Sequence, residues 1–253
     1  MALLQVENLT KEFGGLKALN SVCFDVSEGE ILGVIGPNGA GKTTCFNLLT
    51  GYYLPTAGKV VFKGEEVTNL PDYKRALYGI VRTFQHTNLF PKLTVFDNIL
   101  IGCQRQHKST LADALLRRKK FYSDEELLKA EVKRVLAFIG MQEMADMNAE
   151  NLSYGDQRKL EIAIALAANP EILLLDEPAA GMNPSESAGL LKLIKEIQKL
   201  GITTVLVEHD MKLVMNICER IIVLNYGVKI AEGTPYEIRN NPQVVEVYLG
   251  KRK

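Results

Sequence analysis

The order of apolar and polar residues divides the chain into short strand-like segments near both ends and a helical stretch in the middle. Near-alternation over Asn20–Val26 and Lys59–Lys63 predicts half-buried strands, which favours an antiparallel sheet within residues 1–70. Other segments are apolar without interruption, which is typical of strands buried on both faces of a helix-covered parallel sheet. The expected strands are Leu3–Val6, Ala18–Val26, Ile31–Ile35, Gly58–Phe62, Ile172–Leu175, Thr203–Val207 and Ile221–Leu224.

Helical spacing dominates the middle of the chain, from about residue 93 to residue 140. Apolar residues recur at intervals of three and four from Leu127 to Ile139, and Gly140 then offers a C-terminal stop. Ser123 and Glu126 predict a capping box that opens this helix.

Strands and helices alternate after residue 171. One helix is expected to begin at the cap Asn183-Pro184 and to end at Gly201. Apolar strands that alternate with helices favour a parallel sheet covered on both faces. The expected fold class is therefore α/β, with an antiparallel accessory sheet and an α-helical subdomain inserted into the core.

Composition and charge narrow the class of protein. The chain has 253 residues, of which 47% are hydrophobic and 24% charged, and this excludes wholesale disorder. Its 30 Lys and Arg residues balance 30 Asp and Glu residues, which argues against a nucleic-acid partner bound by bulk charge. The sequence contains no apolar run of membrane-spanning length, no evident signal peptide and no CxxC pair among its four cysteines. We therefore expect a cytoplasmic protein with reduced thiols.

A phosphate-binding loop follows the apolar strand Ile31–Ile35. The run Gly36-Pro37-Asn38-Gly39-Ala40-Gly41-Lys42-Thr43, with Thr44 after it, fits the pattern G-x-x-x-x-G-K-[ST]. The glycines let backbone N–H groups point inward, Lys42 supplies a cation for phosphates, and the Thr43 hydroxyl suits Mg²⁺. The alternative is a glycine-rich turn that matches by chance, and the strand before the loop and the helix after it argue against that.

Two carboxylates end the apolar strand that begins at Ile172. Asp176 suits Mg²⁺ held through water, and Glu177 suits a residue that orients or deprotonates an attacking water. Solvated acids at a strand end are the alternative, which the phosphate-binding loop makes less favoured. A nucleoside triphosphatase is the preferred interpretation.

The chain resembles the ATP-binding subunits of ABC transporters over almost its whole length. Gly36–Thr43 and Ile172–Glu177 resemble that family's Walker A and Walker B motifs, and Leu152-Ser153-Tyr154-Gly155-Asp156-Gln157-Arg158 resembles its signature loop. The usual signature is Leu-Ser-Gly-Gly-Gln, so Tyr154 and Asp156 depart from it. The resemblance implies a RecA-like P-loop core over residues 1–86 and 160–253, and a helical subdomain that carries the signature over residues 87–159.

Further single residues match the family by position. Gln85 resembles the Q-loop glutamine that contacts Mg²⁺ or the attacking water, so Thr43, Gln85 and Asp176 form the implied metal set. His209 follows an expected strand and resembles the switch histidine that contacts the γ-phosphate. Phe13 resembles the aromatic residue that stacks on adenine, although a core aromatic is the alternative.

One segment departs from the family. The D-loop usually reads Ala-Leu-Asp, whereas Ala180-Gly181-Met182-Asn183 stands here. Asn183 occupies the aspartate position and carries no charge, which weakens any transfer of the aspartate's role.

The resemblance implies partners. Ser153, Gly155 and Asp156 are expected to close the nucleotide site of a second ATP-binding subunit, identical or related, in an ATP-dependent dimer with Mg²⁺. Transmembrane permease subunits, and indirectly a solute-binding protein, are the further partners, with the chain on the inner face of the cell membrane. A soluble regulatory or nucleic-acid-associated ABC ATPase and a nucleotide-binding scaffold without turnover are the alternatives.

The subfamily resembled is that of branched-chain amino acid importers. The segments that carry this likeness are Arg82–His86, Leu89-Phe90, Leu152–Arg158, Pro178–Pro184, Ala231–Pro235 and Tyr248–Gly250. Urea importers and lipopolysaccharide-export ATPases are similar and remain alternatives for the substrate. The basic stretch Arg105–Lys120 is interpreted either as a solvated helix face or as a contact with anionic lipid or membrane subunits.

Overall fold

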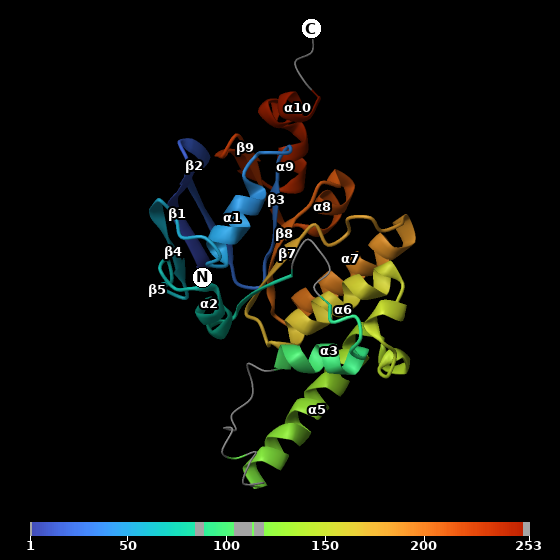
Figure 1. The fold of residues 1–253 in the computed structure, drawn as a ribbon. Coiled ribbons are helices and arrows are strands. Elements are labelled where there is room, and N and C mark those ends of the chain that lie inside the picture. The colour runs from blue at the N-terminus through green and yellow to red at the C-terminus, as the bar shows by residue number, and fades with distance from the viewer. Residues whose placement is uncertain (1, 84–88, 104–112, 114–118, 250–253) are drawn as a thin grey trace.

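The computed structural model describes residues 2–83, 89–103, 113 and 119–249. Two β-sheets lie side by side, and helices cover the larger of them (Figure 1). The smaller sheet is antiparallel, with the strand order β2-β1-β4-β5. Its strands are β1 (Ala2–Phe13), β2 (Leu16–Ser27), β4 (Ala57–Phe62) and β5 (Glu65–Glu66). The expected antiparallel accessory sheet is confirmed.

The larger sheet has the strand order β10-β9-β3-β8-β7-β6. Five of its strands are parallel, and β10 pairs with β9 in the antiparallel sense at one edge. The strands are β3 (Ile31–Ile35), β6 (Ile80–Arg82), β7 (Ile172–Asp176), β8 (Thr203–Val207), β9 (Arg220–Asn225) and β10 (Val228–Gly233). The order brings the carboxyl ends of β3, β8 and β7 next to one another, although these strands are far apart in sequence.

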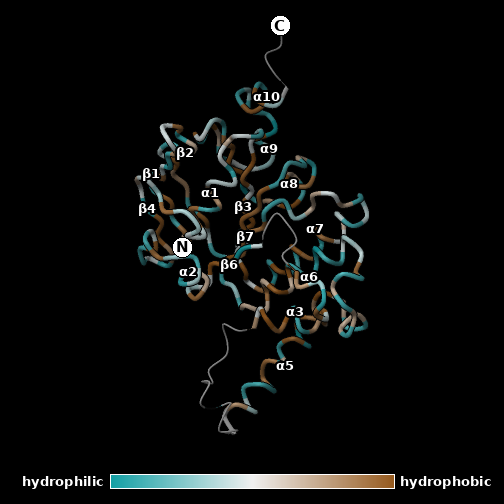
Figure 2. Tube along the Cα trace, in the orientation of Figure 1, coloured by the Kyte–Doolittle hydropathy of each residue, from teal (hydrophilic) through white to brown (hydrophobic). Residues whose placement is uncertain are grey.

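Alternating side chains of the parallel strands enter two separate cores. Leu32 and Val34 of β3 pack toward the antiparallel sheet and the helix α1 (Lys42–Leu49). Ile31 and Ile35 of the same strand pack toward the helices on the other face. The strands are buried on both faces for this reason, and Figure 2 shows them as hydrophobic segments at the centre of the molecule.

Most of the other helices cover the second face, and some of them form a lobe. The helix Asp72–Tyr78 instead packs beside α1 through Arg75. The helices α3, α5 and α6 pack together, and α5 projects away from the sheets (Figure 1). The bounds are α2 (Asp72–Tyr78), α3 (Val95–Gly102), α5 (Lys119–Ile139), α6 (Tyr154–Ala167), α7 (Pro184–Lys199), α8 (Met211–Ile217), α9 (Pro235–Asn240) and α10 (Pro242–Leu249), with short 3₁₀ turns at Gln142–Met144 and Ala149–Asn151. The expected boundary between residues 159 and 160 falls inside α6, and the division of the chain into core and lobe stays a prediction.

The capping box expected at Ser123 is wrong. Helix α5 begins at Lys119, so Ser123 lies inside the helix, where an N-cap residue would have to leave helical geometry. The segment before Ser123 contains no helix breaker, and a local cap signature cannot exclude an earlier start. The other end agrees with expectation, because Gly140 has φ +72° and stops the helix.

The second expected cap is confirmed. The Asn183 side chain accepts hydrogen bonds from the N–H groups of Ser185 and Glu186, at 3.0 Å each. The Glu186 carboxylate in turn accepts the Asn183 N–H at 2.9 Å, which completes a capping box. Gly201, with φ +82°, follows the end of α7.

A buried arginine stabilises the end of α1. The Nη1 atom of Arg75 donates to the carbonyl oxygens of Leu48 and Leu49, at 2.6 and 2.8 Å. These carbonyls are among those that a helix C-terminus leaves without an intrahelical partner, and a cation there is favoured by the helix dipole. Burial lowers the pKa of the Arg75 guanidinium to about 10, which still leaves it charged at neutral pH.

Within the described residues, no helix is both long and apolar enough to cross a bilayer. The four cysteines are present as free thiols, of which Cys23 is exposed and Cys45, Cys103 and Cys218 are buried.

Candidate active site

The loop between β3 and α1 is held so tightly that two of its glycines are sterically required. A Cβ atom on Gly36 would lie 2.2 Å from the carbonyl oxygen of Leu224, which is closer than real Cβ atoms come. Gly41 has φ +102°, and a Cβ atom there would lie 2.6 Å from the carbonyl oxygen of Ala18. The turn therefore depends on glycine at both positions.

The first turn of α1 is open to an anion. Gly41 precedes the helix, and among the described residues no side chain caps it and no acidic residue occupies its first turn. The first N–H groups of a helix lack intrahelical partners and carry the positive end of the helix dipole. This combination is typical of phosphate sites.

Lys42 lies beside these amides. Its Nζ atom donates to the carbonyl oxygens of Gly36 and Pro37, at 2.7 and 3.1 Å, and the residue is 5% exposed. Burial lowers the pKa of the Lys42 ammonium, while the charges of Glu177 and Asp176 raise it. The lysine thus stands as a buried cation in contact with the loop itself.

The loop opens into a pocket of about 1150 Å³. The pocket is lined by Asn38–Thr44 from the loop and by Glu177 and His209 from the ends of β7 and β8. On its other side are Phe13, the segment Gly15–Ala18 and Tyr226. This is the carboxyl end of the parallel sheet, where α/β proteins bind ligands.

Asp176 lies at the end of β7 and is 1% exposed. Its Oδ2 atom accepts a hydrogen bond from Nη2 of Arg82 at 2.7 Å, whereas its buried Oδ1 atom has no hydrogen-bond partner among the described residues. Burial raises the pKa of this carboxyl, and the adjacent Arg82 lowers it. A buried carboxylate oxygen without a partner suits a cation ligand. No group of three or more His, Cys, Asp or Glu side chains in the described residues forms a cation site by itself.

Glu177 and His209 form a pair at the pocket wall. The Oε1 atom of Glu177 lies 2.6 Å from Nε2 of His209. Glu177 adopts φ +48°, an uncommon conformation for a residue other than glycine. Its side chain is mostly buried while that of His209 is about half exposed, so the pair faces the pocket.

Glu208 is a site-adjacent residue that sequence reasoning missed. It is 4% exposed, and its two carboxylate oxygens accept the N–H groups of Ala179 and His209, at 2.8 and 3.1 Å. Burial raises the pKa of this carboxyl, and those N–H groups lower it. Glu208 therefore ties the turn after Glu177 to His209. The available signal was an acidic residue directly after a wholly apolar strand.

Aromatic residues stand at the open side of the pocket. Phe13 is 41% exposed, and its ring meets that of Tyr53 edge to face with 5.3 Å between centroids. Tyr226, which sequence reasoning also missed, is 84% exposed on the turn after β9. A planar ligand group could stack here.

The signature residues lie elsewhere. Ser153 caps α6 by accepting the N–H of Asp156 at 3.2 Å, and its hydroxyl donates to the Asp156 carboxylate at 2.7 Å. Gly155 is buried against Glu186. Ser153, Gly155 and Asp156, all described, are not among the residues that line the P-loop pocket of the same chain. Gln85 and His86 lie outside the described residues, as do Arg105–Lys108 and Arg117-Arg118 of the basic stretch.

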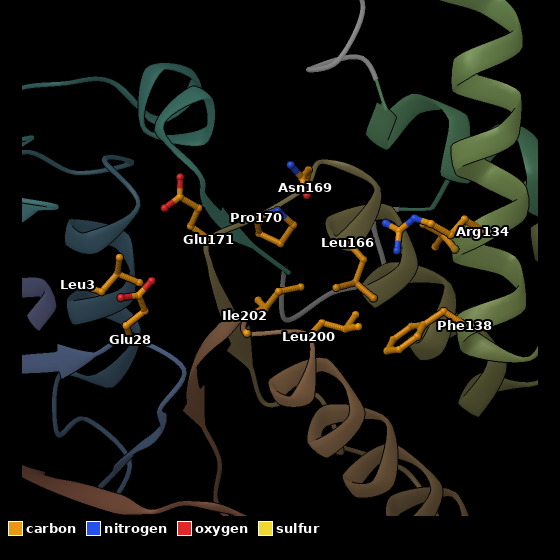
Figure 3. A pocket seen from close by; sticks show the side chains of 12 residues that line it. Leu3, Glu28, Arg134, Phe138, Leu166, Asn169, Pro170, Glu171, Leu200 and Ile202 are labelled. Carbon is orange, nitrogen blue, oxygen red and sulfur yellow. The ribbon is translucent and has the colours of Figure 1, made fainter. Parts of the chain in front are cut away.

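A second pocket, of about 330 Å³, lies at the opposite end of the parallel strands. Figure 3 shows Arg134 and Phe138 of α5 on one side of it and Glu28 on the other, with Ile202 and Leu200 between them. Glu171 and Ile202 directly precede β7 and β8, whereas the P-loop pocket lies where these strands end. The two pockets are therefore separate.

The parallel sheet, the open helix terminus behind a glycine-rich loop and the paired carboxylates define a P-loop nucleoside triphosphatase. The chain belongs to the ABC transporter family, which it matches over residues 19–180. Residues 228–253 match a further family described as the branched-chain amino acid ATP-binding cassette transporter.

Relatives of known name match over nearly the whole chain. The high-affinity branched-chain amino acid transport ATP-binding protein LivG of Escherichia coli (strain K12) is 48% identical over 250 residues, which cover 98% of each chain. The corresponding protein BraF of Pseudomonas aeruginosa is 44% identical over the same coverage. A crystal structure of the ADP conformation of an ABC transporter ATP-binding cassette superposes with a TM-score of 0.87 at 34% identity, covering 99% of this chain and 100% of that one.

These findings confirm the family, the fold class and the ATPase activity expected from the sequence, and with them the binding of a nucleotide. The likeness to the ATP-binding proteins of branched-chain amino acid importers is confirmed as well.

Proposed function

We propose that this chain binds MgATP in the P-loop pocket, closes around it with a second ATP-binding subunit, and so drives permease subunits that import branched-chain amino acids. The Glu177–His209 pair carries the catalytic part of the proposal, because it faces the same pocket as the open terminus of α1. The match of residues 228–253 and the LivG and BraF relatives support the substrate.

The phosphates of ATP bind at the start of α1. Backbone N–H groups of Gly39–Thr44 and the ammonium of Lys42 supply the positive charge, and the dipole of α1 adds to it. The Lys42 ammonium is already held at the loop by hydrogen bonds to the Gly36 and Pro37 carbonyl oxygens. It therefore needs little rearrangement to face a phosphate. Phe13 provides a stacking surface for adenine at the open side of the pocket.

The residues present fit a Mg²⁺ ion. Thr43 is exposed and lines the pocket, and the buried Oδ1 atom of Asp176 has no hydrogen-bond partner among the described residues. Gln85, outside the described residues, is the third proposed ligand. When bound, Mg²⁺ neutralises phosphate charge that develops during hydrolysis. Arg82 keeps Asp176 in position through its other carboxylate oxygen, Oδ2.

Glu177 is the proposed general base. A carboxylate that accepts a proton from water must lie within hydrogen-bond reach of it, and Glu177 lines the pocket at the end of β7. His209 contacts one carboxylate oxygen of Glu177 and orients the side chain. Glu208 holds the backbone of His209 and of Ala179 and thus maintains the geometry of the pair.

A second subunit completes each site. Ser153 and Gly155 do not line the pocket of their own chain, so they are free to serve the nucleotide of a partner, in the arrangement that the family resemblance implies. Among solved relatives, a bacterial ABC transporter cassette at 27% identity, with a TM-score of 0.77 over 92% of this chain, is described as dimeric. ATP then acts between the subunits, and hydrolysis releases them.

The proposed location is the cytoplasmic face of the cell membrane, bound to permease subunits that the described helices do not supply. A solute-binding protein is the indirect partner that delivers the amino acid.

Replacement of Glu177 tests the catalytic part. Glu177→Gln is expected to lower kcat by roughly 10²–10⁴-fold, the usual contribution of a positioned general base. The variant should retain ATP and accumulate as an ATP-dependent dimer, which size-exclusion chromatography with and without MgATP would detect. Glu196→Gln, on the solvent side of α7, is the matched control and should behave as wild type. Wild-type turnover in Glu177→Gln would contradict the proposal.

Transport assays test the substrate. Cells whose own copy of this chain is replaced by Glu177→Gln should lose uptake of labelled leucine but not of labelled urea. If urea uptake is lost and leucine uptake is not, the proposed substrate class is wrong and the ATPase assignment still holds.

A further inference from the structure

Two of the departures from the family pattern, Tyr154 in the signature and Gly181 in the D-loop, lie against each other. The Tyr154 hydroxyl donates a hydrogen bond to the carbonyl oxygen of Ala180 at 2.8 Å. A Cβ atom placed on Gly181 would lie 3.2–3.4 Å from the ring and hydroxyl of Tyr154. Gly181 also has φ +79°, a conformation that favours glycine. The large residue on one element thus occupies the space that the small residue on the other leaves.

Arg158 holds the side chain of Tyr154 in place through hydrogen bonds to its hydroxyl. It is 5% exposed, and its Nε and Nη2 atoms donate to the Tyr154 hydroxyl at 3.1 and 2.8 Å. Its Nη1 atom contacts Glu161 at 2.9 Å, and its guanidinium lies 5.2 Å from the centroid of the Tyr154 ring. A phenol has one proton to donate and two lone pairs, so the hydroxyl of Tyr154 is fully used.

A second contact joins the start of α6 to the start of α7. A Cβ atom on Gly155 would lie 2.9 Å from Oε1 of Glu186, and the Oε2 atom of Glu186 accepts the Asn183 N–H that opens α7. The start of α6 therefore packs on the start of α7, two helices that lie next to each other in Figure 1. Between Glu177 and Asn183 the chain makes two successive turns, with hydrogen bonds from the Ala180 N–H to Glu177 and from the Met182 N–H to Ala179.

We infer that Tyr154 is a positioning residue that couples the signature turn to the segment carrying Glu177. The inference rests on the proposed function, in which Ser153 and Gly155 serve the partner's nucleotide and Glu177 serves the nucleotide of its own chain. A shift of the signature turn when it meets the partner's nucleotide moves Tyr154. Through the Ala180 carbonyl, that movement reaches the turn that begins at Glu177. One chain thereby links the two sites of the dimer.

Tyr154→Phe is the first test, because it keeps the ring over Gly181 and removes only the hydroxyl. The change removes the hydrogen bond to Ala180 and the two that the hydroxyl accepts from Arg158. We expect kcat for ATP hydrolysis to fall about fivefold to tenfold, because the link to Ala180 is lost. The KM for ATP, and the affinity of the isolated monomer for a fluorescent ATP analogue, should stay within about twofold of wild type, because Tyr154 does not line the P-loop pocket. Activity is normalised to nucleotide-binding sites, so a smaller folded fraction cannot imitate a fall in kcat. Tyr236→Phe, a change at an exposed tyrosine on α9, is the matched control.

Gly181→Ala approaches the same contact from the other side and decides the question if Tyr154→Phe does not fold. The added methyl group meets the Tyr154 ring, so the same split between a lowered kcat and an unchanged nucleotide affinity is expected. Gly201→Ala, after the end of α7, is its control, because Gly201 has a similar φ of +82° and a Cβ atom there meets nothing within 4 Å.

Wild-type kcat in both variants overturns the inference, as does a loss of nucleotide affinity that matches the loss of kcat. Glu177→Gln separates this outcome from failure of the proposed function. If Glu177→Gln loses turnover while Tyr154→Phe and Gly181→Ala do not, the ATPase site stands and only the coupling is wrong.

Discussion

At the scale of single residues, the site is built from side chains whose chemistry is set by burial. Lys42, Asp176 and Glu208 are each at least 95% buried and lie at the carboxyl end of the parallel sheet. Burial lowers the pKa of Lys42 and raises that of both carboxyls. Opposite charges act against the shift at Lys42 and Asp176, and backbone N–H groups act against it at Glu208. Buried ionisable groups with shifted pKa values are typical of functional sites, because burial and neighbouring groups tune their protonation.

Lys42→Ala should weaken nucleotide binding on the order of 10²-fold, since a charge-assisted hydrogen bond to a phosphate is among the strongest that a protein makes. Titration of the isolated monomer with a fluorescent ATP analogue measures this directly. Lys74→Ala, an exposed position on α2, is the control and should bind as wild type. Equal affinities for the two variants would contradict the assignment of the P-loop.

The cysteines offer a test of burial that does not involve the nucleotide. Burial raises the pKa of Cys45 and of Cys218 to about 12, and of Cys103 to about 11, so roughly 0.1% or less of these thiols is ionised at pH 8. An excess of Ellman's reagent at pH 8 should therefore modify one thiol rapidly in the native protein and all four after denaturation. Cys23→Ser should abolish the rapid phase, because Cys23 is the exposed cysteine. A rapid phase that persists would show that a buried thiol is accessible.

At the scale of elements, helix ends decide how the site and the lobe are positioned. Gly41 leaves the first turn of α1 open, Asn183 closes the first turn of α7, and Ser153 closes that of α6. The same chain thus uses an uncapped terminus where a phosphate is expected and capped termini where the segment has to stay in place. The cap expected at Ser123 had the right residues at the right spacing, but α5 starts earlier.

This difference predicts unequal stability effects for two polar-to-alanine changes. Asn183→Ala should lower the free energy of unfolding by about 1 kcal/mol, because it removes a side-chain cap and the reciprocal bond of Glu186. Ser123→Ala should change it by less than about 0.5 kcal/mol, since an exposed position inside a helix tolerates alanine. Thermal unfolding without nucleotide compares the two. A larger effect at Ser123 would mean that α5 begins there.

At the scale of the whole molecule, the P-loop pocket and the signature turn occupy different places on one chain. Ser153 caps α6, whereas residues of the loop before α1 and of the ends of β7 and β8 line the pocket. Figure 1 shows α6 apart from α1. In the proposed mechanism, a single chain presents two incomplete sites. Their completion by a second subunit predicts that two different defective chains can repair each other.

Mixing Ser153→Arg with Lys42→Ala tests this prediction. Each variant alone should hydrolyse ATP poorly, and Ser153→Arg should retain ATP binding as a monomer because its own P-loop is intact. In an equal mixture, a head-to-tail heterodimer contains one intact pair of P-loop and signature, so about a quarter of the wild-type sites should be active. Steady-state ATPase assays on each variant and on the mixture measure the recovery. No recovery, together with weakened monomer binding by Ser153→Arg, would place the signature in its own chain's pocket.

The sequence by itself determined the strands β3, β7 and β8, the phosphate-binding loop and the positions of Glu177 and His209. These features depend on short-range properties: an uninterrupted apolar run, the backbone freedom of glycine, and the residue that directly follows a strand. Local order along the chain is enough to recognise them, and the parallel sheet then brings the strand ends together.

Only the tertiary structure decided which distant residues meet. Arg82 reaches Asp176, Glu208 holds Ala179, Tyr226 borders the pocket, and Tyr154 bonds to Ala180. The three hydrogen-bonded pairs, Arg82–Asp176, Glu208–Ala179 and Tyr154–Ala180, are each separated by 26 residues or more in the sequence. No periodicity relates positions so far apart. Their contacts follow from the order of the strands and from the packing of α6 on α7, because side chains far apart in the sequence become neighbours only when whole elements are placed against each other.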